Sequence, residues 1–126
     1  PWHFGGQRYQ NLFVHPLEII EWCNALDLRM CFDISHSMLA ANNFGYSFYE
    51  MCEQIAPLTA RLHIGDAEGL NGEGLQIGDG SIDFERAGKI LQELAPHPTF
   101  IPEIWQGHKN DGEGFWKALD ILEDVI

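Results

Sequence analysis

Three short apolar stretches, each followed by a segment with helix signals, constrain the fold of this chain more than any other feature. The stretches cover residues 28–32, 60–64 and 99–103. Short, nearly continuous apolar runs are typical of strands that are buried on both faces of a parallel sheet. Strands that alternate with helices in this way predict an α/β fold with parallel strands.

Caps and apolar stripes predict the helices around these strands. Pro16 suits the first turn of an initial helix, because its missing N–H needs no partner there. Ser47 begins a capping box before a helix that runs to about residue 56. Asp83 can cap a third helix, and an apolar stripe over residues 115–122 marks a fourth. The remaining segments are expected to be loops, one of them with a helical turn. They cover residues 1–13, 35–44 (the segment with the turn), 65–80 and 106–114.

The spacing of the strands predicts units of a (β/α)₈ barrel. One strand and its helix repeat every 30 to 40 residues or so, and a complete barrel needs roughly 250 residues. The chain has 126 residues and begins at Pro1 without Met, so we expect a single domain that is a piece of a longer protein. Half a barrel leaves two unpaired sheet edges. We therefore expect it to form a homo-oligomer or to pair with the remainder of a full-length barrel.

Each of the three strands is followed or closed by a side chain that can bind a metal. These side chains are Asp33, His63 and Glu103. The carboxyl ends of parallel strands meet at one rim, so we expect the three to lie together. Two carboxylates and an imidazole suit Mn²⁺ or Mg²⁺, and also Co²⁺ or Zn²⁺. The ordinary alternatives are a helix cap, a satisfied core histidine and a surface acid, but these would have to coincide at equivalent strand ends.

Three further residues are candidates for substrate contacts at this rim. His36 lies three residues beyond Asp33 and could donate to a substrate oxygen or carry a proton. Asp66 could orient His63 or contact the metal or the substrate. Trp2 could form part of an apolar wall for a sugar, although it could equally be an ordinary core aromatic.

Charge and cysteine content narrow the possible partners and the compartment. The chain has 7 Lys and Arg against 19 Asp and Glu, a net charge of −12, which disfavours nucleic acid. The three cysteines lie in apolar contexts, which favours buried, reduced thiols in a cytoplasmic protein. No apolar run approaches the ~20 residues that would span a membrane.

Four short motifs in order carry a resemblance to a known family. They are Asp33-x-x-His36, His63-x-x-Asp66, the loop over residues 75–84, and Pro102-Glu103. With them the chain resembles the xylose isomerase-like TIM barrels, a superfamily of sugar-phosphate isomerases and epimerases that also includes the endonuclease IV type (AP endonuclease family 2). The resemblance implies that the chain is the second, C-terminal half of that barrel.

The resemblance also implies roles for the site residues. In the epimerase branch a divalent metal is held by Glu, Asp, His and Glu from strands five to eight, and the last three map onto Asp33, His63 and Glu103. It further implies that His36 contacts substrate. The first glutamate, which is also one of the acid–base pair, would end a strand at or before Pro1. The resemblance therefore implies an incomplete site in this chain, with only Glu103 of the pair.

The function that we expect is a metal-dependent isomerase or epimerase of a small sugar or sugar phosphate. The metal would act as a Lewis acid. Glu103 would move a proton between neighbouring carbons through an enediolate. The alternatives are a metal-dependent dehydratase or phosphodiester hydrolase of the same superfamily, or a non-catalytic domain of a larger sugar-pathway enzyme.

Overall fold

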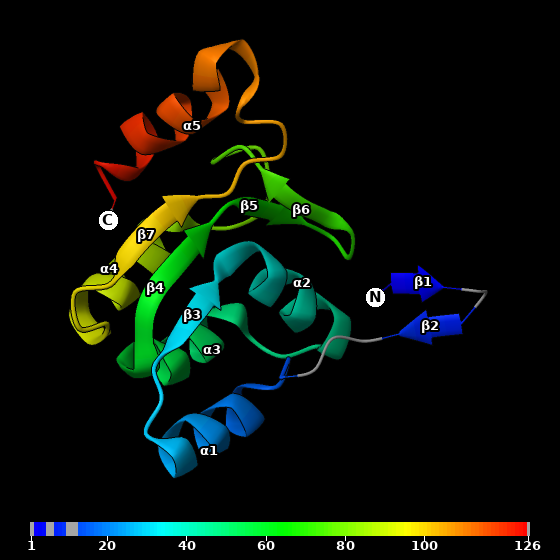
Figure 1. The fold of residues 1–126 in the computed structure, drawn as a ribbon, viewed down its shortest axis with the longest axis vertical. Helices are drawn as coiled ribbons and strands as arrows, with labels where there is room; N and C mark the ends of the chain where they lie inside the picture. Colours follow the sequence, from blue (N-terminus) through cyan, green and yellow to red (C-terminus); the bar gives the residue numbers. More distant parts are fainter. Residues whose placement is uncertain (1, 5–6, 10–12, 126) are drawn as a thin grey trace.

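The fold is given by a computed structural model that describes residues 2–4, 7–9 and 13–125, with side chains described within 13–125 (Figure 1). The helices and strands alternate along most of the chain. In chain order they are β1 (Trp2–Phe4), β2 (Gln7–Tyr9), α1 (Pro16–Leu26), β3 (Met30–Asp33), α2 (Ile34–Phe44), α3 (Phe48–Ile55), the 3₁₀ turn η1 (Ala56–Leu58), β4 (Thr59–Ile64), β5 (Asp66–Glu68), β6 (Gly72–Leu75), α4 (Phe84–Leu94), β7 (Thr99–Pro102) and α5 (Lys109–Leu122).

The central sheet confirms the α/β prediction. Strands β3, β4 and β7 are parallel and lie in the order β3-β4-β7. Strands β3 and β7 are each followed by a helix, and β4 is followed by the β5–β6 pair and then by α4. The register pairs Asp33 with His63, and His63 with Ile101. The ends of all three strands therefore lie at the same edge of the sheet.

The two faces of this sheet have opposite surroundings. Phe32 and Leu62 are register partners on one face, and both are fully buried in the hydrophobic core. In Figure 1 helices α3 and α4 lie behind the sheet. Cys31, Arg61 and Thr99 are register partners on the other face, and all three are exposed. Parallel sheets are usually covered on both faces, whereas the described residues leave this second face open.

The helices expected from caps are confirmed, with small shifts in their bounds. Pro16 begins α1, and the side chain of Ser47 caps α3 by accepting from Glu50 N. Asp83 caps α4 in the same way, by accepting from Arg86 N. None of the helices in the described ranges has the length and apolar character needed to cross a bilayer.

Residues 35–44 differ most from the sequence prediction, because they belong to a regular helix rather than to a loop with one turn. Asp33 is the N-cap of α2, and Gly45 ends the helix in the left-handed conformation with φ 76°. Both are common helix boundaries. A helix cap was the alternative reading of Asp33, but residues 35–44 were still expected to be a loop with one helical turn.

The other predicted loops also contain regular structure. Strands β1 and β2 form an antiparallel pair within residues 1–13, and β5 and β6 form another within residues 65–80. Helix α5 already begins at Lys109, although residues 110–112 have positive φ and interrupt it.

The cysteines divide between the core and the open face. Cys23 and Cys52 are buried, and burial raises the pKa of the Cys52 thiol to about 12. Cys31 is exposed because its side chain lies on the uncovered face of the sheet, so the prediction of three buried thiols was wrong for this residue.

Candidate metal centre and adjoining pocket

The three side chains at the strand ends lie together. Asp33, His63 and Glu103 each offer one ligand atom, and these atoms lie within 4.8 Å of one another. His63 Nδ1 is 3.1 Å from Glu103 Oε2. The side chains of Asp33, His63 and Glu103 are 26%, 34% and 58% exposed, so the cluster is open to small ligands. The structure thus gathers the residues that we predicted as metal ligands.

Backbone contacts fix the position of Glu103 beside β4. Its N–H donates to Ile64 O at 2.8 Å, which continues the strand pairing by one residue beyond Pro102. A Cβ on Gly65 would lie only 2.7 Å from Glu103 O. Glycine therefore allows the ends of β4 and β7 to approach closely, and this approach sets the distance between His63 and Glu103.

Asp33 is both a member of the cluster and a helix cap. Its Oδ1 accepts from His36 N at 2.9 Å, and its Oδ2 lies 2.6 Å from His36 Nδ1. An ionised carboxylate has about four lone-pair sites. Two are used here, so the cap and a bound cation are compatible. Asp33 therefore serves as a helix cap, which was the ordinary alternative, and it also lies in the cluster of candidate metal ligands.

His36 lies between two carboxylates. Its second ring nitrogen, Nε2, lies 3.1 Å from Glu73 Oε2. The hydrogen bond with Asp33 raises the pKa of His36 to about 9, with a smaller contribution from Glu73 and some opposition from burial. At neutral pH the ring is therefore an imidazolium that can donate from both nitrogens.

Asp66 is not brought into this cluster. Its side chain is fully buried, and its Oδ1 accepts from the N–H groups of Ala67 and Ile82 at 2.8 and 3.1 Å. Its Oδ2 accepts from the N–H groups of Gly78 and Gly80 at 3.0 and 2.9 Å. Three of these bonds, those from Gly78, Gly80 and Ile82, hold the segment after β6 against the residues that follow β4. We expected Asp66 to contact His63, metal or substrate, but its carboxylate is engaged with backbone instead.

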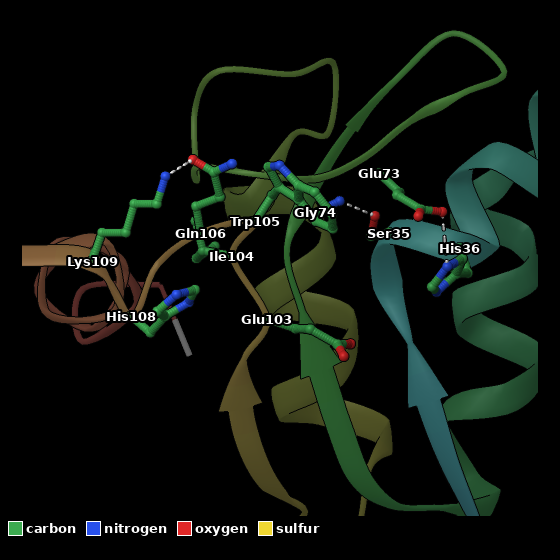
Figure 2. A pocket seen from close by; sticks show the side chains of 10 residues that line it. All are labelled: Ser35, His36, Glu73, Gly74, Glu103, Ile104, Trp105, Gln106, His108 and Lys109. Atoms are coloured by element: carbon green, nitrogen blue, oxygen red, sulfur yellow. Dashed lines mark hydrogen bonds and ion pairs between the residues drawn. The ribbon is translucent and has the colours of Figure 1, made fainter. Parts of the chain in front are cut away.

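A cavity of about 530 Å³ adjoins the cluster (Figure 2). This volume is within the range of small-molecule sites. Its ionisable and aromatic lining residues are His36, Glu73, Glu103, Trp105, His108 and Lys109. The cavity thus joins the predicted catalytic pair, Glu103 and His36, to the loop that precedes α5.

The sequence analysis missed the lining residue Glu73 and gave no role to His108 and Lys109. Glu73 lies in the predicted loop 65–80, and nothing in its spacing indicated a site. The Asn71-Gly72 dipeptide is a hairpin signal that could have placed Glu73 on a strand. The hairpin is held against α2 because Gly74 N donates to Ser35 Oγ at 2.8 Å. Trp2 lies in β1, and its side chain falls outside the described part of the structure.

The arrangement combines metal ligands with a cation and an open cavity. Three protein ligands leave coordination positions for oxygens of a bound molecule. His36 lines this cavity with its Nδ1 engaged by Asp33 and its Nε2 by Glu73, so a bound molecule would have to replace Glu73 to accept from it. Comparison of the chain with protein-family models and with curated proteins gave no match in either case.

Proposed function

We propose that Asp33, His63 and Glu103 hold a divalent metal ion in an isomerase or epimerase that acts on a small sugar. The observation that carries the proposal is the convergence of three ligand atoms within 4.8 Å at the carboxyl ends of three parallel strands. This edge of a parallel sheet is where α/β enzymes bind their substrates.

The chemistry of the donors favours a hard or borderline cation. Oxygen donors from Asp33 and Glu103 with one imidazole from His63 suit Mn²⁺ or Mg²⁺, and Co²⁺ or Zn²⁺ also accept such a set. All three cysteines are outside the cluster. When bound, the ion would polarise a carbonyl and its neighbouring hydroxyl as a Lewis acid.

The protein's own residues would then move the proton. Glu103 takes the proton from the carbon next to the carbonyl, and the electron pair of that C–H bond passes to the carbonyl oxygen as an enediolate. Return of the proton to the adjacent carbon completes an isomerisation. His36 stays bonded to Asp33 through Nδ1, and its Nε2 donates a hydrogen bond to a substrate oxygen that takes the place of Glu73 Oε2.

We further propose that the three strand–helix units belong to a (β/α)₈ barrel. Three features support this: the ligands lie at the carboxyl ends of the strands, one face of the sheet is open, and the motifs resemble the barrel superfamily. In a barrel the open face with Cys31, Arg61 and Thr99 would be the interior. A second copy or the rest of a barrel would supply the covering strands.

A second candidate is dehydration of a sugar or related polyol. The observation that favours it is His36, whose raised pKa of about 9 makes it a proton donor at neutral pH. Loss of water from a carbon next to the carbonyl requires an acid that protonates the departing hydroxyl. His36 lines the cavity, and its Nε2 would protonate this hydroxyl once the substrate displaces Glu73 from that nitrogen.

The decisive experiment replaces Glu103 with Gln, and Glu93 on the exposed side of α4 serves as a matched control. We expect Glu103→Gln to lower Mn²⁺ affinity by at least about tenfold and to abolish turnover of any ketose that the protein converts. Glu93→Gln should behave as the unchanged protein. Calorimetry gives the affinity and circular dichroism verifies the fold. Unchanged Mn²⁺ affinity in folded Glu103→Gln would refute the metal centre.

A further inference from the structure

The cavity next to the cluster has two ends of different charge. Figure 2 shows His36 and Glu73 on one side, His108 and Lys109 on the opposite side, and Glu103 between them. The end near Glu103 and Glu73 carries the carboxylates. The far end carries an ammonium and an imidazole that are adjacent in the chain.

Lys109 has hydrogen-bonding capacity to spare. Its Nζ donates to Gln106 Oε1 at 2.8 Å, and an ammonium has three donors. No ion pair between Lys109 and an acid occurs within residues 13–125. Among the residues whose side chains are described, it is also the one Lys or Arg that lines the cavity, in a chain with 7 such residues against 19 acids. Lys109 is exposed, so its remaining donors are available to an acceptor on a molecule bound in the cavity.

The turn that carries His108 and Lys109 is held by tight packing. Gly107 N donates to Ile104 O at 2.9 Å, and Lys109 N donates to Gln106 O at 3.0 Å. A Cβ on Gly107 would lie 2.6 Å from the Phe115 ring. The turn is thus docked against α5. This packing holds the backbone of His108 and Lys109 in place at the cavity.

We infer that His108 and Lys109 bind an anionic group of the substrate, a phosphate or a carboxylate, at the end of the cavity opposite His36 and Glu73. The inference rests on the proposed function only for the end of the substrate that would react at Glu103. In the metal-free protein the two carboxylates of Glu73 and Glu103 outnumber the single imidazolium of His36, so this end of the cavity repels an anion. The substrate is therefore oriented, with its hydroxyl and carbonyl oxygens toward Glu103 and its charge toward Lys109.

The first test uses free anions on protein kept metal-free with EDTA, so that it does not depend on the metal centre. Inorganic phosphate and acetate are titrated separately while the His108 imidazole resonances are followed by NMR. We expect saturable chemical-shift changes of His108 with at least one anion. The anion that binds more tightly identifies the anionic group of the substrate as a phosphate or a carboxylate. Lys109→Gln should weaken this binding by about tenfold. Lys117→Gln, an exposed lysine on the same helix outside the cavity, should leave it unchanged.

The second test uses sugars on Mg²⁺-saturated protein. Ribulose 5-phosphate is compared with ribulose, and glucuronate with glucose, by calorimetry. We expect the anionic member of at least one pair to bind about tenfold more tightly, and Lys109→Gln to remove that preference. Three results would overturn the inference. Neither anion gives saturable His108 shifts, or Lys109→Gln and Lys117→Gln weaken anion binding equally. The third is that the neutral sugars bind as tightly as both anionic ones. Loss of metal binding alone would refute the proposed function and leave the anion result standing.

Discussion

Asp33 is the last residue of β3, and Asp66 comes shortly after the neighbouring parallel strand β4, so both lie at the same edge of the sheet, but their surroundings are opposite. Asp66 is fully buried, and its two oxygens accept four backbone N–H groups. Asp33 is 26% exposed and accepts one backbone N–H and one imidazole bond. A carboxylate whose lone-pair sites are filled by backbone stabilises the fold. One with free sites, beside His63 and Glu103, remains available to a ligand.

The largest effect that we expect is the loss of stability in Asp66→Asn. The amide group offers one acceptor oxygen in place of two, so two buried N–H groups lose their partner, and we expect a cost of about 3 kcal/mol in the free energy of unfolding. Urea unfolding measures it. Asp79→Asn, an exposed aspartate in the same segment, should change stability by less than about 0.5 kcal/mol. Equal costs for the two variants would mean that Asp66 does not have the structural role that sets it apart from Asp33.

Asp33→Asn should have the opposite effect, with little change in stability and a large loss of metal affinity. Asn is as good an N-cap as Asp, so we expect the free energy of unfolding to change by less than about 1 kcal/mol. Mn²⁺ affinity should fall by at least about tenfold, because a charged ligand is lost. Calorimetry with Mn²⁺ measures this, with the exposed Asp120→Asn on α5 as the control. Undiminished Mn²⁺ affinity in Asp33→Asn would make Asp33 a helix cap alone.

The smallest effect concerns the imidazole bond that distinguishes Asp33 from Asp66. The pKa of His36 is about 9 in the folded protein, against an ordinary value of 6.5. Because the pKa of His36 is higher in the folded than in the unfolded protein, protonated His36 stabilises the fold. This contribution to the free energy of unfolding is fully present below pH 6.5 and is lost as the pH rises toward 9. Metal-free protein should therefore lose some stability between these values. His36→Gln should lack this component of the pH dependence, and NMR titration of His36 gives its pKa directly. A His36 pKa near 6.5 would contradict the paired geometry.

The parts of the fold that were predictable depend on local signals. The strands were marked by apolar runs, and Pro16, Ser47 and Asp83 marked three helices. The candidate ligands were predictable because parallel strands bring their carboxyl ends together. Each of these inferences needs only residues close in sequence, plus one rule of topology.

The parts that were not predictable depend on contacts distant in sequence. The carboxylate of Asp66 accepts hydrogen bonds from backbone N–H groups that lie 12 to 16 residues later in the chain. Nothing in the His63-x-x-Asp66 motif indicates these bonds. Glu73 reaches His36 only because a hairpin folds against α2, and these two residues are 37 positions apart. Helix α2 was missed for a different reason, since Asp33 serves as cap and candidate ligand at once.

The open face of the sheet has a consequence for whatever covers it. Arg61 lies there with its Nε donating to Thr99 Oγ1 at 3.4 Å, and a guanidinium carries five N–H donors. Covering the face would strip water from this charge, at a cost of several kcal/mol unless acceptors replace it. A purely apolar partner surface would therefore fit poorly. The complementary surface has to bring a carboxylate or a set of carbonyl oxygens to Arg61.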